Sequence, residues 1–206
     1  MRGSAIPVVW EVGHGTHAKL TEVAPQFFLT SWEGEPVSGM ASFRLLSDAT
    51  ALWFWMGVGT EMIPSFLEKG AFVEGLWEDI VMELFLGQKG ESAYEEWNLG
   101  RGGAWWHQGF SSYRERARAS SAKDLPGVSS GWWESDDRTQ WAGLLRFPWE
   151  RKQLGNLVLQ VSGISVHPES GRKSHFASVE IPNRSPDFHL LELFPQPIFK
   201  RMEENL

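Results

Sequence analysis

The sequence predicts an all-β protein, an antiparallel β-sandwich of two packed sheets with little helix. Three observations support this fold class. The apolar runs are short, and 21 Gly and 11 Pro spread along the 206 residues separate them at short intervals, which is typical of β domains with many turns. Residues 80–86 alternate between an apolar face and a mixed face, the period of a strand. Helical signals are confined to two single turns, at 65–69 and at 149–154 after Pro148.

Ten strands follow from these runs. In chain order they are Ile6–Val12, Gln26–Trp32, Met40–Leu46, Ala51–Val58, Ile80–Gly87, Ala93–Leu99, Ala104–Ser111, Gln140–Phe147, Leu157–Val166 and His175–Glu180. The run 51–56 is apolar on both faces, which predicts a central strand covered on both sides. Residues 115–131 are expected to form a mobile loop or an irregular edge segment. The gaps are too short for linkers, so we expect one domain over 1–206, a jelly-roll or immunoglobulin-like sandwich.

The composition excludes several classes of protein. Without Cys, the chain cannot be a disulfide scaffold or use thiolate zinc sites, iron–sulfur clusters or cysteine nucleophiles. The formal charge is 19 − 26 = −7 with no basic run, which argues against nucleic-acid binding. No apolar run approaches the ~18 residues of a membrane helix. The N-terminus lacks an apolar stretch long enough for a signal peptide, so we expect a cytoplasmic protein.

Tryptophan is the unusual residue of this chain. There are 12 Trp against 2 Tyr. Such an excess serves either a bulky sandwich core or flat binding platforms, because an indole offers a wide face and an N–H donor. We expect core packing for most of them. Trp105 and Trp106 are consecutive, so on a strand they point to opposite faces, one into the core and one toward the polar face or its rim.

The alternation of two neighbouring strands brings polar side chains together. In 80–86, Glu83 shares a face with two apolar residues, which predicts a partly enclosed second face rather than ordinary surface. In 94–99, Tyr94, Glu96 and Asn98 share a face. If the two strands pair as a hairpin through 87–92, these polar faces coincide. The opposite face is then the core, and the residues expected to be nearly fully buried are Ile80, Met82, Leu84, Trp97 and Leu99.

One stretch resembles a known family. The run GLWEDIVMELFLG (75–87), followed by AYEEWNL (93–99), GAW (103–105) and SSYR (111–114), resembles the DOMON-like domains, which are similar to the family 9 carbohydrate-binding modules. The shared pattern is W-x-D-x-x-x-E-x-F, then an aromatic-Glu-x-Asn strand. Residues 186–189, Pro-Asp-Phe-His, look like the family's closing Phe-His element. The resemblance covers most of the chain in order and implies a β-sandwich of two antiparallel sheets.

The resemblance also implies a binding site. Sugar-binding members hold a terminal sugar between two Trp side chains, with carboxylate, amide and Arg partners for its hydroxyls. Trp77 and Glu83 match the motif's Trp and Glu, whereas the second clamp Trp falls near 175–176, where this chain has His and Phe. The candidate ligand-binding residues are Trp77, Glu83, Glu96, Asn98, Trp105, Trp106, Arg114, His175 and Phe176.

The chemistry of these residues suits a carbohydrate. The C–H face of a pyranose packs on an indole plane, and its hydroxyls need donors and acceptors at the rim. A Glu carboxylate accepts from two adjacent hydroxyls, and an Asn amide both donates and accepts. We therefore expect non-catalytic binding of a carbohydrate or polyol, with no nucleic-acid or membrane partner.

Other interpretations stay open. Trp77 would equally cap a core while Glu83 pairs with an Arg such as Arg114, in a domain with a structural or protein-interaction role and no small ligand. Glu83 and Glu96 could form the acid–base pair of a glycosidase, whose carboxyl groups lie ~5–9.5 Å apart, but no second motif supports an enzyme.

Cofactors are not expected. His14 and His17 have a spacing that suits a metal only with a third ligand, and two loop histidines are the better interpretation. Glu78 and Asp79 are an acidic pair that could contribute to a structural calcium site. Some DOMON domains hold haem through Met and His. Met56 and Met82 lie on predicted core faces, where Met usually fills space, so a haem or redox module is a lesser alternative. The residues available for haem are Met56, Met82, His107, His175 and His189.

Overall fold

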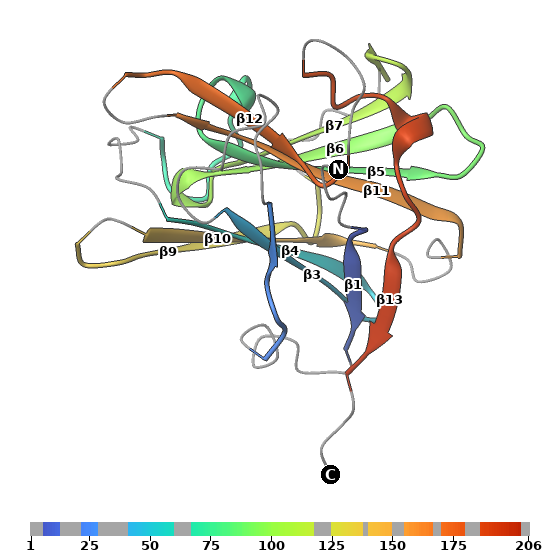
Figure 1. The fold of residues 1–206 in the computed structure, drawn as a ribbon, viewed down its shortest axis with the longest axis horizontal. Coiled ribbons are helices and arrows are strands. Elements are labelled where there is room, and N and C mark those ends of the chain that lie inside the picture. The colour runs from blue at the N-terminus through green and yellow to red at the C-terminus, as the bar shows by residue number, and fades with distance from the viewer. Residues whose placement is uncertain are drawn as a thin grey trace.

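Two β-sheets stacked face to face make up the protein (Figure 1). The computed structural model describes residues 6–12, 22–28, 41–59, 67–117, 125–137, 140–149, 155–166, 170–179 and 186–202. These residues form β1 (Val8–Glu11), β2 (Gln26–Phe27), β3 (Ser42–Ser47), β4 (Ala51–Gly59), β5 (Val81–Gln88), β6 (Tyr94–Gly100), β7 (Trp105–Ser112), β8 (Glu115–Arg116), β9 (Ser129–Glu134), β10 (Gln140–Pro148), β11 (Leu157–Val166), β12 (Lys173–Ala177) and β13 (Ile198–Arg201).

Helix is confined to three-residue 3-10 turns in the part of the chain that the structure describes. Those with described bounds are η2 (Leu76–Glu78), η3 (Arg101–Gly103) and η5 (Leu191–Leu193), and residues 155–156 also have 3-10 conformation. The all-β fold class is thus confirmed. Among the described residues, no helix is long and apolar enough to cross a membrane. Of the two predicted helical turns, 65–66 and 150–154 lie outside the described residues.

The two layers have different strand orders. The upper layer in Figure 1 runs β12-β11-β5-β6-β7-β8, and the lower layer runs β13-β1-β3-β4-β10-β9, with β2 paired to β3. In the upper layer each strand is antiparallel to its neighbours. The predicted hairpin of β5 and β6 is present, with Glu83 opposite Asn98. The central position predicted for 51–56 is confirmed, because β4 lies between β3 and β10.

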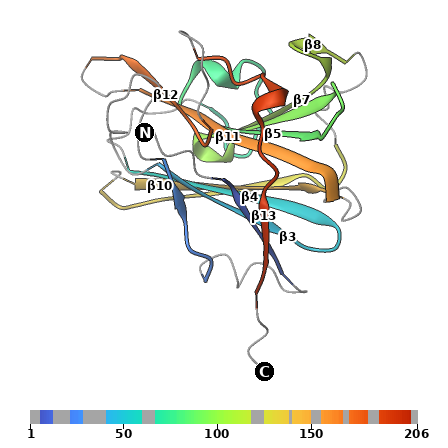
Figure 2. The same cartoon turned by 45° about the vertical axis from the view of Figure 1, so that its right-hand side comes forward.

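The sheet of the lower layer contains parallel pairs beside its antiparallel ones. Strand β1 runs parallel to both β3 and β13. Parallel neighbours need a long crossover between them rather than a tight turn. The chain supplies one, since 30 residues separate the end of β1 at Glu11 from the start of β3 at Ser42. Figure 2 shows β13, near the C-terminus, in the lower sheet, where it is the edge strand next to β1.

Most predicted strands match an observed strand to within a few residues. The second is described only as β2, because residues 29–32 lie outside the described part, as do Met40 and Glu180. Three strands were not predicted: β8, β9 and β13. The first two fall within or next to the segment 115–131, and each is the edge strand of its sheet. Strand β8 has only two residues, both exposed, and no residue of β9 is fully buried, so neither carries the apolar alternation of a half-buried strand.

The core between the sheets uses the face that alternation assigned to it. Trp97 is 3% exposed, and the other four residues of the predicted set are equally buried in the same cluster. The facing sheet contributes aromatic rings such as Phe54 and Phe147. The register of β5 and β6 is therefore confirmed, which fixes the direction of every polar side chain on these strands.

A second apolar cluster covers the outward face of the upper sheet. It joins strand residues such as Phe85 and Trp106 to Leu76 of η2 and to Phe188 and Phe194 of the C-terminal segment. Figure 1 shows this segment passing η5 at the edge of the upper sheet before it descends to β13. Non-strand segments thus enclose the outward face of this sheet. The sequence predicted a partly enclosed face here, because Glu83 shares it with two apolar residues of the same strand.

Candidate ligand-binding site

A pocket of about 380 Å³ lies on the outward face of the upper sheet. Strands β5, β6 and β7 form its floor, η2 and the turn between β7 and β8 form its sides, and the segment after residue 186 partly covers it. Its walls combine aromatic rings with ionisable groups. The lining residues are Trp77, Glu83, Glu96, Trp106, Phe110, Arg114, Arg116, Ile164, His175, Pro186, Phe188 and His189.

Two glycines set the position of η2 over the sheet. Gly75, just before the turn, has φ 80°, a left-handed conformation that Gly adopts without strain. Gly100, at the end of β6, leaves room for the turn, since a Cβ there would lie 2.8 Å from Cδ1 of Leu76. Leu76 is consequently buried against the sheet, and the next residue, Trp77, lines the pocket half-buried.

The aromatic wall consists of Trp77 and Trp106. Their ring centroids lie 4.7 Å apart at an interplanar angle of 67°, the edge-to-face arrangement that indoles favour. Glu74 holds this wall in place: it accepts a hydrogen bond from Trp106 Nε1 at 2.8 Å and pairs with Arg116 Nη1 at 3.1 Å. The Arg116 guanidinium lies 5.5 and 5.4 Å from the two ring centroids, within cation–π range.

The two carboxyl groups lie at the base of the pocket. Glu83 and Glu96 are each only 4% exposed. Ser162 Oγ donates to Glu83 Oε2 at 2.8 Å, and Asn98 Nδ2 donates to Glu96 Oε1 at 3.0 Å. Asn98 Oδ1 is buried without a hydrogen-bond partner. Asn98 is fully buried and is not among the lining residues, so it holds Glu96 by this hydrogen bond rather than lining the pocket itself.

Burial changes the acidity of both groups. It raises the pKa of Glu83 to about 7, an effect that the Ser162 hydrogen bond partly offsets. It raises the pKa of Glu96 to about 8, and the nearby charge of Glu83 adds to the increase. Near neutral pH at least one of the two carboxyls carries a proton. A protonated carboxyl can donate as well as accept, which matches the hydrogen-bonding capacity of a ligand hydroxyl.

His189 completes the polar side of the pocket. The Arg114 backbone N–H donates to the Tyr94 hydroxyl at 3.1 Å, and that hydroxyl lies 2.8 Å from His189 Nδ1. Burial, followed by the charge of Arg114, lowers the pKa of His189 to about 4, so the ring is neutral at pH 7. In the tautomer in which the Tyr94 hydroxyl donates to Nδ1, the ring proton is on Nε2, 3.8 Å from Glu96 Oε2. This exceeds hydrogen-bond length, so the Nε2 donor is available to a ligand oxygen.

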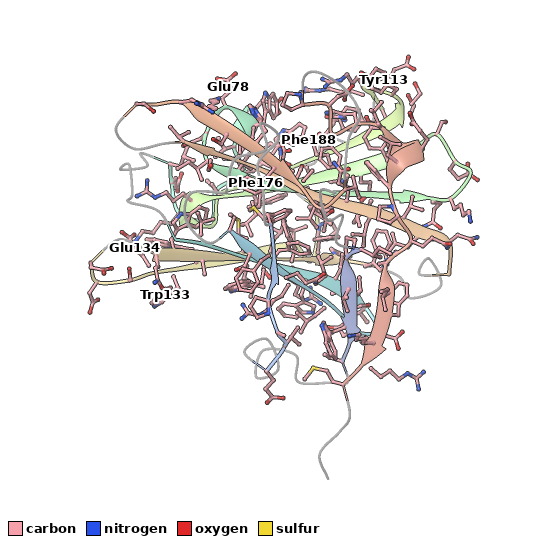
Figure 3. All side chains as sticks on the ribbon, viewed as in Figure 1. Glu78, Tyr113, Trp133, Glu134, Phe176 and Phe188 are labelled. Atoms are coloured by element: carbon pink, nitrogen blue, oxygen red, sulfur yellow. The ribbon has the colours of Figure 1, made fainter. Side chains whose placement is uncertain are left out.

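The structure places six of the nine predicted residues in the lining: Trp77, Glu83, Glu96, Trp106, Arg114 and His175. Asn98 supports the base, as described above. The other two predictions need correction. Trp105 and Phe176 belong to the core between the sheets, and Figure 3 shows Phe176 between the two layers. Consecutive strand residues alternate, so Trp106 and His175 face the pocket while these neighbours face inward.

Arg114 does not pair with Glu83 as the structural interpretation supposed. Its Nη2 lies 3.2 Å from Asp187 Oδ1. Several lining residues were not predicted, among them Phe110, Ile164 and His189. Phe110 shares a face of β7 with Trp106, so alternation extended along that strand would have found it. Ile164 lies on β11, which holds no predicted site residue, and is paired with His175 of β12. His189 belongs to the segment 186–189 that the family resemblance had picked out, but strand alternation gives no signal for its place in the pocket, because only the tertiary fold brings this segment over the sheet.

No metal cluster occurs in the part of the chain that is described: no three His, Asp or Glu residues lie close enough to hold an ion there. Asp79 Oδ1 accepts the Ile80 N–H at 2.7 Å. His14 and His17 lie outside the described residues. Met56 and Met82 are fully buried in the core between the sheets, the location that the sequence predicted.

Comparison with known proteins rests on structure alone, since no protein-family model and no curated protein matches the chain. A protein from Bacteroides uniformis, proposed to bind carbohydrate, superposes with a TM-score of 0.70 and 14% identity, over 96% of this chain and 100% of that one. A family 9 carbohydrate-binding module from Caldicellulosiruptor kristjanssonii in complex with glucose superposes with a TM-score of 0.60 and 11% identity, over 90% and 88% of the two chains.

A second structure of a family 9 module from the same organism, in complex with cellotriose, has a TM-score of 0.60 and 11% identity over 96% of both chains. At these identities the likeness concerns the fold. The similarity inferred from residues 75–114 is thereby supported across nearly the whole chain: this protein is similar in fold to the family 9 carbohydrate-binding modules.

Proposed function

We propose that the protein binds a carbohydrate, or a related polyol, in this pocket without altering it chemically. One observation carries the proposal: an indole wall and two buried carboxyl groups, Glu83 and Glu96, meet in one pocket of about 380 Å³. Small-molecule sites commonly span ~300–1,000 Å³. The pocket has the size for one sugar ring.

The arrangement offers a sugar both kinds of contact it needs. The Trp77 indole presents an apolar surface to the C–H face of a pyranose. The carboxyls of Glu83 and Glu96 and the Nε2 donor of His189 present directional partners for its hydroxyls. Because these groups are largely withdrawn from water, a hydroxyl in the wrong orientation would leave one of them unpaired, which disfavours the wrong stereoisomer.

The structural neighbours support this class of ligand. Two of them are carbohydrate-binding modules in complex with glucose and cellotriose, and a third is proposed to bind carbohydrate. Fold alone does not determine function, so the residues of the pocket carry the argument here.

Binding is expected to be weak. Among the indoles that line the pocket, Trp106 is only 1% exposed, so Trp77 alone has substantial surface for a ligand. One stacking face and a few hydrogen bonds must offset the lost freedom of the sugar. We expect a Kd between roughly tens of micromolar and millimolar, about −4 to −6 kcal/mol.

Isothermal titration with a panel of monosaccharides and disaccharides tests the proposal. At least one sugar should bind, and Trp77→Ala should weaken it by at least about tenfold, the loss of one main contact residue. The matched control is Trp133→Ala, since Trp133 is 57% exposed on the other sheet and should leave Kd unchanged. Thermal melting confirms that both variants fold.

Three results would contradict the proposal. If no sugar binds at tens of millimolar, the protein-interaction interpretation replaces it. If a sugar binds equally well to Trp77→Ala, binding occurs elsewhere. If the titrated sugar is cleaved, as detected by chromatography of the ligand after incubation, the site is catalytic.

A further inference from the structure

A second pocket lies on the same side of the molecule, beyond the first. It has a volume of about 560 Å³ and is bounded by the turn between β5 and β6, the turn between β7 and β8, and the segment around η5. Tyr94, Tyr113 and Phe194 provide its aromatic surface, and Ser92 and Gln196 are among its polar groups. Lys89, Glu91 and Glu192 add charged groups, so this pocket, like the first, combines aromatic rings with ionisable side chains.

A single layer of side chains separates the two pockets. His189 lines both. Tyr94, hydrogen-bonded to His189, lines the second pocket only. Of two consecutive residues in the turn after β7, Tyr113 lines the second pocket and Arg114 lines the first. A molecule that passes over this layer would contact both pockets at once.

The layer is held rigidly by Asp187. Its Oδ2 accepts from the Tyr113 hydroxyl at 2.6 Å, and its Oδ1 accepts from Arg114 Nη2 and from the His189 N–H, both at 3.2 Å. Arg114 has φ 55°, and among the described residues no other non-glycine residue has a positive φ. Such strain persists only where the surroundings hold it, and it is found preferentially at binding and catalytic sites.

Tyr113 has the properties of a stacking platform. Its hydroxyl is fixed by Asp187, yet the residue remains 55% exposed. Figure 3 shows Tyr113 on the outward side of the upper layer, at the opposite end from Glu78 of η2, with Phe188 between them. The Arg114 guanidinium lies 5.7 Å from the centroid of this ring. An immobilised ring that is still half exposed binds a flat partner with little loss of side-chain freedom.

We propose that the second pocket is a subsite for the next sugar of an oligosaccharide whose terminal ring occupies the first pocket, with Tyr113 stacking on that second ring. This inference rests on the proposed function and makes it more specific: the preferred ligand is an oligosaccharide. Two linked subsites act on one ligand, so their contributions reinforce each other without a second cost of association.

A chain-length series tests the inference. Glucose and cellotriose are titrated into the wild-type protein by calorimetry, together with mono- and trisaccharides of mannose, galactose and xylose. For the sugar series that binds, we expect the trisaccharide to bind at least about tenfold more tightly than the monosaccharide. Tyr113→Ala should reduce this ratio to about two or less. Ser92→Trp, which fills the second pocket from another wall, should have the same effect, and Trp133→Ala should preserve the ratio.

Each outcome decides between the alternatives. A ratio near one in the wild-type protein, with measurable monosaccharide binding, overturns the second subsite and leaves the proposed function intact. A large ratio that neither Tyr113→Ala nor Ser92→Trp reduces shows that the added rings bind elsewhere, which also overturns it. Absence of binding by every saccharide overturns the proposed function, and with it this inference.

Discussion

Replacing Trp97 by alanine is expected to lower the free energy of unfolding by about 3–5 kcal/mol, the range found for large buried aromatic residues. Trp97 stands on β6 and stacks on Phe147 of β10, with ring centroids 4.1 Å apart and an interplanar angle of 12°. It therefore joins the two sheets through their shared core. Its Nε1 also donates to Glu95 Oε2 at 3.1 Å. The cavity left by truncation would have walls in both sheets.

Urea unfolding followed by circular dichroism measures this change. The control is Trp133→Ala, which removes an equal side chain from an exposed position and should change stability by no more than about 0.5 kcal/mol. Comparable losses in the two variants would contradict the assignment of Trp97 to the core.

Glu96→Gln is expected to remove much of the pH dependence of stability between about pH 5 and pH 8. The pKa of Glu96 is raised to about 8 in the folded protein, whereas an unfolded Glu titrates near ~4.3. Between these values the folded state binds more protons than the unfolded state. The free energy of unfolding therefore falls as the pH rises through this window, and it levels off above the folded pKa.

Other groups contribute to the same profile. Glu83, with its pKa raised to about 7, has the same sign as Glu96. His189, with its pKa lowered to about 4, has the opposite sign and adds stability as the pH rises toward 6.5. Burial opposes the ionisation of Asp187, but its hydrogen bonds, first the one from Tyr113, lower its pKa overall. Its contribution to the free energy of unfolding is therefore lost only in solution more acidic than this window. The pKa of Tyr94 is raised to about 12, above the window.

Comparison of the variant with the wild-type protein isolates Glu96 from these groups. At pH 8 Glu96→Gln should be more stable than the wild-type protein by at least about 1 kcal/mol, since one pKa unit corresponds to about 1.4 kcal/mol. At pH 5 the two should be nearly equal. Glu91→Gln, on the exposed turn after β5, is the matched control and should follow the wild-type profile. An unchanged slope in Glu96→Gln would show that this carboxyl is not withdrawn from water.

Much of the fold and part of the site could be predicted because they depend on local pattern. Alternation along β5 and β6 gave the faces of both strands, and a short turn between them made the pairing a hairpin. Glu83 and Glu96 followed directly. The choice between Trp105 and Trp106 could not be made from the sequence, because two consecutive indoles fit either register.

The rest depends on contacts between distant parts of the chain. The parallel pairing of β1 with β13 joins residues about 190 positions apart, and no local pattern encodes such a pair. His189 reaches the pocket for a similar reason: the C-terminal segment packs over the outward face through Phe188 and Phe194. Arg114 was predicted from the sequence, but its partner Asp187 lies 73 residues away.

The most direct test of the central claim is a proton–nitrogen correlation spectrum of the Trp indole groups during titration with the sugar that binds most tightly. Each of the 12 Trp residues provides one indole reporter, and among the described ones only Trp77 and Trp106 line the first pocket. We expect the resonances of Trp77 and Trp106 to shift in a saturable manner, while those of Trp133 and Trp141 stay in place. Saturable shifts at Trp133 with none at Trp77, or no shift at any indole, would contradict carbohydrate binding at this site.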